Sequence, residues 1–172
     1  MGEIKNYKMQ LRKAIPADHN QIGALYYNTV TTINKRDYTP EQIRVWAGNP
    51  LDTEGWTKRI NEQHFFVAED REKIIGFGSV TDEGYLDYMY VHKDFQGQGV
   101  ATALLNAIEE VANNLKLNKI WARVSITARP FFACKGFTIT KQDCTIYKDV
   151  EFPDCIMTKF KSSDSNKSNS AF

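Results

Sequence analysis

The sequence has few cysteines and no apolar run long enough to cross a membrane. Only Cys134, Cys144 and Cys155 occur among 172 residues, and their odd number and spacing suit neither a disulfide framework nor a zinc site. No run approaches the ~18 apolar residues of a membrane span. The N-terminal stretch MGEIKNYKMQ lacks the apolar core of a signal peptide. We therefore expect a cytoplasmic protein with reduced thiols, no metal and no membrane partner.

An excess of charge of either sign is also missing. The chain has 22 Lys and Arg residues against 21 Asp and Glu residues, a formal net charge of +1. Nucleic-acid-binding domains usually carry a basic face or have a high pI, so we expect no nucleic-acid partner. The length favours one domain. The polar segment KSSDSNKSNSAF at 161–172 is predicted to be a disordered tail, which leaves residues 1–160 for that domain.

The spacing of apolar residues changes along the chain from helical to alternating and back. Helical spacing and start signals predict helices at 16–34, 39–48, 53–62, 100–115 and 127–135. Strands are predicted at 8–13, 64–70, 74–82, 85–91, 119–125, 137–147 and 150–160. The three central strands form a meander, which excludes a fully parallel doubly wound sheet. The prediction is a mixed α/β domain.

The stretch QGQGVA at 96–101 places two glycines, Gly97 and Gly99, directly before a predicted helix. Glycine lets the backbone approach an anion closely, and the unpaired amides of a first helical turn attract negative charge. The loop is therefore either a phosphate cradle or a turn that only caps the helix. It matches neither the dinucleotide-binding fingerprint nor the P-loop, because Thr102 stands at the third glycine position and no Gly-Lys-Ser/Thr follows.

Three segments together resemble the GNAT superfamily of acyl-CoA-dependent N-acyltransferases. Residues 96–101 match its Gln/Arg-x-x-Gly-x-Gly/Ala signature, and residues 85–91 resemble its fourth strand. The stretch SITARPFFACKGF at 125–137 resembles a sequence block that the family has further along the chain. The resemblance spans about residues 8–160. It implies one domain with a mostly antiparallel sheet of about seven strands, splayed between strands 4 and 5, with helices on both faces.

The resemblance implies acetyl-CoA as the cosubstrate. Its pantetheine arm is expected along the backbone of Met89, Tyr90 and Val91. Ser125 stands where many relatives have an asparagine near the cofactor, although its hydroxyl could instead cap the short helix. Phe132 is expected to line the same site. The pyrophosphate is expected on the loop and first helical turn, at Gln96, Gly97, Gln98, Gly99, Val100, Ala101 and Thr102.

Transfer to an amine needs a base, because an ammonium has no lone pair and an amine of pKa ~10.4 is mostly protonated near neutral pH. Asp87 is the one acid in YLDYMYV, and alternation would place it on one face with Met89 and Val91. It is either the base or a structural partner; His64 and His92 are weaker candidates, and His92 is expected to be exposed. The resemblance implies a strand amide, at Met89 or Tyr90, as the oxyanion donor. Phe132 occupies the place where the family often has a tyrosine acid.

The acceptor is expected against the first two helices and the last strands, where aromatic residues are concentrated. Tyr26, Tyr38 and Asp87 are the candidates for binding it, and the rings at helical spacing could equally be core. Polyamines, aminoglycosides, amino acids and protein amines all remain open as acceptors, and a homodimer is possible. The predicted activity is N-acetyltransfer to a primary amine by direct transfer in a ternary complex. The alternative is a catalytically weak or inactive protein of this fold that binds or senses acyl-CoA.

Overall fold

A computed structural model describes residues 8–49 and 51–161, and its strands form two antiparallel sheets. The order is β1-β2-β3-β4 in the first sheet and β5-β7-β6 in the second. The predicted tail lies, beyond Lys161, outside the described residues. The strands are β1 (Gln10–Lys13), β2 (His64–Asp70), β3 (Lys73–Val80), β4 (Leu86–Val91), β5 (Lys119–Ser125), β6 (Thr138–Tyr147) and β7 (Val150–Phe160).

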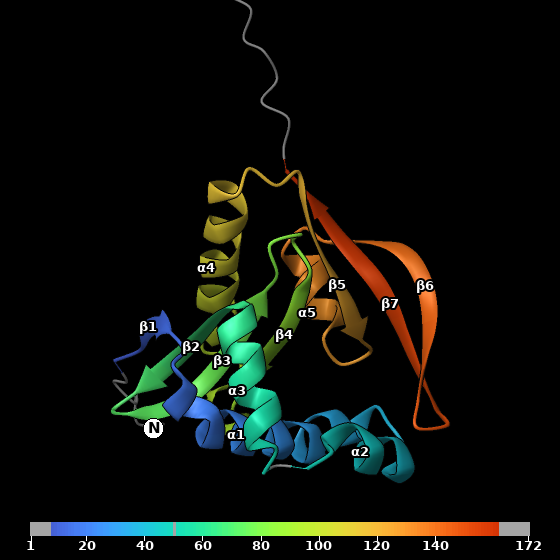
Figure 1. The fold of residues 1–172 in the computed structure, drawn as a ribbon. Helices are drawn as coiled ribbons and strands as arrows, with labels where there is room; N and C mark the ends of the chain where they lie inside the picture. Colours follow the sequence, from blue (N-terminus) through green and yellow to red (C-terminus); the bar gives the residue numbers. More distant parts are fainter. Residues whose placement is uncertain (1–7, 50, 162–172) are drawn as a thin grey trace, which may run out of the picture.

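The two sheets meet where β4 and β5 begin. Tyr85 and Trp121 form an isolated parallel bridge, and the Trp121 amide donates to the carbonyl of Gly84 at 3.0 Å. Beyond this bridge the two strands diverge, so that β4 stays with the first sheet and β5 with the second (Figure 1). The prediction of seven mostly antiparallel strands splayed after the fourth is confirmed.

Helices cover both faces of the first sheet. Helix α4 lies on one face, where Gly76 of β3 allows close approach: a Cβ there would lie 2.6 Å from Cγ1 of Val100. Leu105 and Ile108 of α4 pack in one core cluster with residues of both sheets. Ile22 and Trp56 pack against Phe77 on the other face. The helices are α1 (His19–Thr32), α2 (Pro40–Ala47), α3 (Thr53–Glu62), α4 (Val100–Asn114) and α5 (Arg129–Cys134), with short 3-10 turns η1 (Pro16–Asp18), η2 (Asn34–Arg36) and η3 (Lys93–Phe95).

Helix α2 illustrates how closely local signals set the boundaries. The Thr39 hydroxyl accepts from the amide of Gln42 at 3.2 Å, and the Gln42 side chain accepts from the Thr39 amide at 2.8 Å, which makes a capping box. Pro40 occupies the first turn, where its missing N–H costs nothing. Gly48 follows the last helical residue with φ of 59°. The helix predicted at 39–48 is confirmed.

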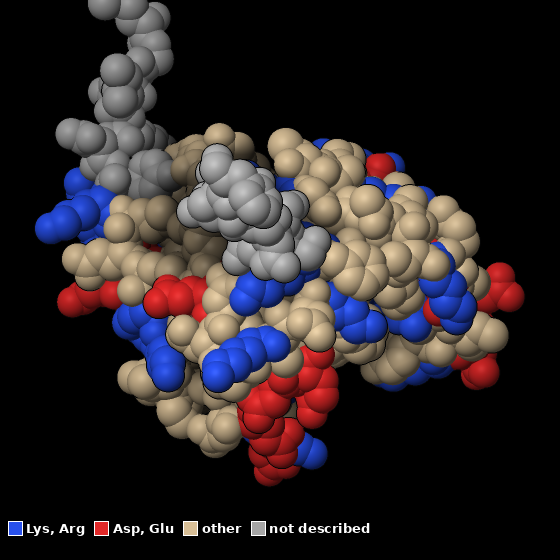
Figure 2. Space-filling view, turned by 90° about the horizontal axis from the view of Figure 1, so that it is seen from above, with Lys and Arg blue, Asp and Glu red and all other residues tan. Residues whose placement is uncertain are grey.

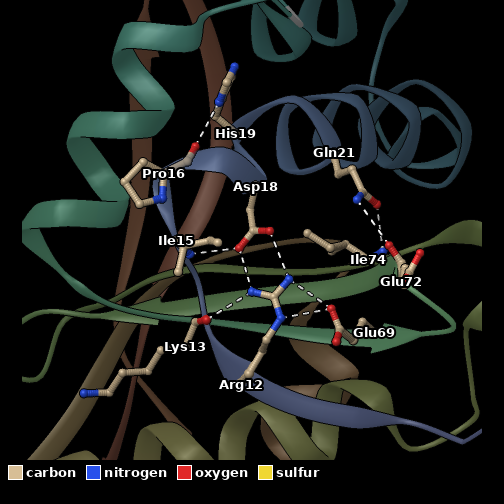
Figure 3. A network of polar contacts seen from close by, with 10 residues as sticks. All are labelled: Arg12, Lys13, Ile15, Pro16, Asp18, His19, Gln21, Glu69, Glu72 and Ile74. Atoms are coloured by element: carbon tan, nitrogen blue, oxygen red, sulfur yellow. Dashed lines mark hydrogen bonds and ion pairs between the residues drawn. The ribbon is translucent and has the colours of Figure 1, made fainter.

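An ion-pair network fixes the N-terminal strand to the turn that follows it. Arg12 donates to both carboxylate oxygens of Asp18, at 2.8 and 3.0 Å, and contacts Glu69 of β2 at 2.9 Å (Figure 3). Asp18, 6% exposed, also accepts from the amide of Ile15 at 2.8 Å. The two-pronged contact sets the direction in which the chain leaves β1 and enters α1.

The surface carries both signs of charge. On the face drawn in Figure 2, the basic and acidic side chains of the described residues are interspersed.

Within residues 8–49 and 51–161, no helix is long and apolar enough to cross a membrane. The same residues contain no group of three or more His, Cys, Asp or Glu side chains that could hold a metal ion. Cys134, Cys144 and Cys155 are free thiols.

Candidate active site

A cleft of about 810 Å³ opens where β4 and β5 diverge. Its walls come from α1 and η2 on one side and from α5 on the other, and it extends to the first turn of α4. The predicted site residues that line it are Asp87, Met89, Tyr90, Val91, Gln96, Gly97, Gly99, Val100, Ala101, Thr102, Ser125 and Phe132. The fold thus brings together, at one opening, residues that lie up to 45 positions apart in the sequence.

The free edge of β4 faces this cleft. The amide of His92 donates to the carbonyl of Ile75 in β3 at 2.8 Å, so these residues form a hydrogen-bonded pair. Such pairs alternate along an antiparallel ladder, which makes Tyr90 and Phe77 the next one. The backbone groups of Met89 and Val91 therefore point to the opposite edge. Of the two predicted amide donors, Met89 is directed toward the splay, whereas Tyr90 is directed toward β3.

The loop before α4 has room for an anion. Gly97 and Gly99 have φ of 69° and 85°, a region that favours glycine. A Cβ built on either residue would meet no atom within 4 Å, so the space beside this backbone is open. Helix α4 begins at Val100 and presents its unpaired first-turn amides there. Lys93 and Lys135 also line the cleft. The open backbone, helix start and cations fit a diphosphate such as that of coenzyme A.

The side chain of Gln96 turns inward to β4. Its Nε2 donates to the carbonyl of Val91 at 2.7 Å, and the Thr29 hydroxyl donates to the same oxygen at 3.2 Å. The Val91 carbonyl already has two donors, so its amide is the group left for a ligand at that position. Gln98 donates through Nε2 to the carbonyl of Asp94 at 2.9 Å. Both glutamine side chains thus shape the loop, and the backbone forms its open surface.

Asp87 lies on a different face from the one predicted. The pairing of β3 with β4 passes from Ser79 and Tyr88 to Val80 and Leu86, so Asp87 is the extra residue of a β-bulge. Its carboxylate accepts from Nε2 of Gln63 at 2.8 Å, on the side covered by α3. Met89, in contrast, packs on the α4 side. The prediction of a common face for Asp87, Met89 and Val91 is wrong, because the bulge interrupts the alternation.

The positions of Ser125 and Phe132 fit a supporting role at the end of β5. The Ser125 hydroxyl accepts from the amide of Ala128, the residue before α5, at 3.3 Å, as the capping alternative expects. Ser125 also lines the cleft. Phe132 is buried and meets Phe137 edge-on with ring centroids 5.0 Å apart. At the position where the family often has a tyrosine acid, this chain therefore has a phenylalanine ring without a hydroxyl.

The histidines contribute structure near the cleft. The side chain of His92 is 13% exposed, which contradicts the expected exposure, and its Nδ1 accepts from the amide of Asp94 at 3.2 Å. Burial lowers the pKa of His92, and nearby Lys73 adds to the shift. His64 contacts Asp82 at 2.7 Å. Each ring therefore already has a polar partner, the Asp94 amide for His92 and the Asp82 carboxylate for His64.

The two tyrosines predicted to bind the acceptor occupy different places. Tyr26 packs edge-on against Trp56 and Tyr90, with centroids 5.3 and 4.9 Å away, and donates to the Trp46 carbonyl at 3.0 Å. Burial raises the pKa of Tyr26. Tyr38 accepts from the amide of Ile126 at 2.8 Å and lines a smaller cavity beside the cleft. Tyr26 therefore packs behind Tyr90, which lines the cleft, whereas Tyr38 itself lines the smaller cavity.

Two polar residues of the site carry no recognisable signal in the sequence. Asn34 is 6% exposed and lines the cleft, and its Oδ1 has no hydrogen-bond partner among the described residues. Gln63 connects Asp87 to Ser79, whose hydroxyl donates to its Oε1 at 2.6 Å. Asn34 ends a predicted helix and Gln63 lies between a predicted helix and a predicted strand, so only their tertiary neighbours reveal these two amides. A buried acceptor facing a cleft fits a ligand with an N–H group.

Comparison with known proteins agrees with this geometry. Residues 34–149 match the family model of the acetyltransferase (GNAT) domain. The chain is 32% identical over 134 residues to the uncharacterized N-acetyltransferase YafP of Escherichia coli strain K12, covering 78% of this chain and 84% of that one. A GCN5-related N-acetyltransferase structure from Rhodopseudomonas palustris superposes with a TM-score of 0.86 and 25% identity, over 93% of this chain and all (100%) of that one.

More distant structures share the fold and contain the expected ligand. The PaiA N-acetyltransferase of Thermoplasma acidophilum, solved in complex with coenzyme A, has a TM-score of 0.77 at 17% identity over 90% of this chain and 99% of that one. The YncA putative acetyltransferase of Salmonella typhimurium, solved with acetyl-CoA, has a TM-score of 0.68 at 19% identity, covering 91% and 96%. The family match, the relative in Escherichia coli and the splayed sheet lead to one conclusion: the chain belongs to the GNAT family of acetyltransferases and is an acyltransferase.

Proposed function

We propose that the protein transfers an acetyl group from acetyl-CoA to a primary amine, directly, in a complex that holds both substrates. The observation that carries this proposal is the free edge of β4, which opens into the same cleft as the Gly97–Gly99 loop. A pantetheine arm can add to such an edge as a peptide does in β-augmentation. The loop would then hold the diphosphate, and acetyl-CoA supplies the activated thioester.

The backbone of β4 supplies the electrostatic part of the reaction. The amide of Met89 is the candidate donor to the thioester oxygen, because it points to the splay and Tyr90 pairs with β3. A fixed amide donor is effective where negative charge develops, since it needs no reorganisation during the reaction. The Val91 amide is the candidate partner for the pantetheine arm.

Asp87 is the candidate base. Asp87 lines the cleft and its carboxylate is held by Gln63, so we expect it to take a proton from the acceptor ammonium directly or through water. The neutral nitrogen then forms the new N–C bond as the C–S bond breaks. The leaving thiolate, whose thiol has an ordinary pKa of ~8.5, takes its proton from water or from the acceptor without a dedicated acid. This accounts for the tolerance of phenylalanine at position 132.

The decisive experiment measures free thiol release from acetyl-CoA with a panel of primary amines, together with identification of the acetylated product. Initial rates with both substrates varied should give intersecting lines, as direct transfer in a ternary complex requires. Parallel lines would instead indicate an acetylated enzyme. Tight acetyl-CoA binding without turnover on any amine would favour the inactive, acyl-CoA-binding alternative.

A further inference from the structure

A second cavity, of about 240 Å³, adjoins the cleft. The two share Trp46, Tyr90, Arg123 and Ser125 in their linings, so they are continuous at the point where β4 and β5 diverge. The cavity lies between α2 and the hairpin of β6 and β7, whose turn approaches α2 in Figure 1. Its volume is below the ~300–1,000 Å³ of sites for drug-sized ligands. It therefore suits a small molecule placed next to the Met89 edge.

Aromatic rings make up most of this cavity. Six of its ten lining residues are Tyr, Trp or Phe. Three of them contact one another: Trp46 lies 5.0 Å from Tyr38 and 6.3 Å from Phe152, and Tyr38 lies 6.4 Å from Phe152, between ring centroids. Trp46 and Phe152 are only half-buried, in contrast to core residues. Ring faces attract cations within about 6 Å, so such a lining suits an ammonium on an apolar body.

The charged residues of the cavity compensate each other. Asp154, 7% exposed, accepts from Nη1 of Arg123 at 2.8 Å, and the same nitrogen contacts Asp143 at 3.1 Å. Asp143 is also paired with Lys141 at 3.3 Å, so two cations face two carboxylates. Arg123 is therefore already engaged by two carboxylates. Asp87 is the one carboxylate among the described residues that line the adjoining cleft. The region near the reacting end thus has one carboxylate not neutralised by an arginine or lysine, enough for a single cation.

We propose that this cavity binds the acceptor and that the acceptor is a small monoamine: one ammonium on an apolar body, without a carboxylate. The inference rests on the proposed function and narrows its acceptor. A carboxylate on the ligand would face Asp154 and Asp143 with Arg123 already occupied. A second ammonium in the cavity would find no unpaired carboxylate to balance it, because Asp154 and Asp143 are already paired with Arg123 and Lys141. Amino acids and polyamines are therefore disfavoured relative to a monoamine.

The test compares ligands that share one body. 2-Phenylethylamine and phenylalanine differ only by the carboxylate, and spermidine carries extra ammonium groups. Calorimetry in the presence of coenzyme A should give 2-phenylethylamine an affinity at least about tenfold higher than either, because like-charge contacts cost several kcal/mol. Equal or tighter binding of phenylalanine or spermidine would overturn the inference. So would the lack of any binding of 2-phenylethylamine.

Thiol release with the same ligands separates this inference from the proposed function. Turnover of spermidine or phenylalanine in preference to 2-phenylethylamine would leave acetyl transfer intact and overturn the acceptor class. Tight binding of 2-phenylethylamine with no turnover of any amine would support the cavity assignment and contradict acetyl transfer. We expect 2-phenylethylamine to have a higher kcat/KM than spermidine or phenylalanine.

A matched pair of variants tests the role of the rings. Phe152→Leu retains apolar volume but removes one ring face, and it should raise the KM for 2-phenylethylamine about 3- to 30-fold with acetyl-CoA affinity unchanged. Phe160→Leu, on the same strand and 62% exposed, is the control and should match the wild type. An unchanged KM in folded Phe152→Leu would contradict the proposed cation-binding wall.

Discussion

Gln63 holds the carboxylate of Asp87 at 2.8 Å through Nε2 while its Oε1 accepts from the hydroxyl of Ser79 at 2.6 Å. Ser79 is fully buried, with 0% exposure. The hydroxyl donates to the amide oxygen, so the orientation of the Gln63 side chain is set and its NH₂ group must face Asp87. The carboxylate in the bulge of β4 is therefore held in one orientation by a neutral donor.

Asp87→Asn tests the proposed base. Asparagine can still accept from Gln63 but cannot take a proton from the acceptor, so kcat should fall by about 10²–10⁴-fold. The activity should recover partly at higher pH as neutral amine becomes available. Steady-state rates from pH 6.5 to 9, with acetyl-CoA affinity measured by calorimetry as the control, would check this. Wild-type turnover across that range would remove Asp87 from the chemistry, and loss of folding would indicate a structural role.

Gln63→Glu tests the positioning of that base. A second carboxylate beside Asp87 raises the pKa of the pair, because like charges at this distance cannot both ionise easily. The acidic limb of the kcat/KM profile should move to higher pH by about one unit or more. Gln142→Glu adds the same charge at an exposed site of β6 and should leave the profile in place. An unmoved limb in Gln63→Glu would show that Asp87 does not set it.

Gly99→Val tests the anion cradle. A β-branched residue is strained at φ of 85°, and its side chain would project into the open space beside the loop. We expect acetyl-CoA affinity to fall by tenfold or more, roughly the value of one to two lost amide contacts. Gly136→Val shares a φ of 86° but lies outside the loop, so it controls for backbone strain. Equal losses in the two variants would argue against a local role of the loop.

Phe132→Tyr tests whether a tyrosine acid is needed. The ring is 3% exposed and packs against Phe137, so an added hydroxyl without a partner should lower the free energy of unfolding by about 1–3 kcal/mol. Turnover should change only a few-fold if water or the acceptor protonates the thiolate. Urea unfolding and kcat would be measured together. A gain of ~10²-fold or more would mean that the natural chain lacks a needed proton donor.

Asp18→Asn tests the network around Arg12. Burial acts to raise the pKa of Asp18, but hydrogen bonds from Arg12 and the Ile15 amide outweigh it and lower the pKa below its ordinary value of 3.8. The stability from this carboxylate is therefore present above pH ~4 and is lost as pH falls through the lowered pKa. The free energy of unfolding of the variant should be lower by about 1–3 kcal/mol at pH 7. It should also fall less steeply than that of the wild type as the pH is lowered. Asp149→Asn, in an exposed turn, should behave like the wild type.

Local signals were sufficient for most elements but not for the site. The boundaries of β2 at 64–70 and of α2 were predictable because capping and turn residues flank them. The bulge at Asp87 was not, since two strands must pair before an extra residue has any meaning. The same holds for His92, whose shielding comes from contacts such as the ring of Phe95, 5.7 Å away.

The polar contacts of the cleft were equally invisible in the sequence. Asn34 and Gln63 follow helices as ordinary polar residues, and only the fold brings the first to the cleft and the second between Ser79 and Asp87. Of the aromatic residues that line the smaller cavity, Tyr38 was the one predicted to bind the acceptor. Its partners Trp46 and Phe152 lie 106 positions apart and meet because α2 packs against β7.

The joint between the two sheets has a mechanical consequence. Apart from the bridge at Tyr85 and Trp121, the described parts of β4 and β5 are held in register by side chains under α4, such as Leu86, Ile108 and Ala122. Apolar contacts have no fixed direction, whereas ladder hydrogen bonds do. We therefore expect the gap to widen or narrow by movement of apolar side chains past one another, with no backbone hydrogen bond broken in the described strands. The resistance of the splay to opening should then depend on how tightly α4 packs.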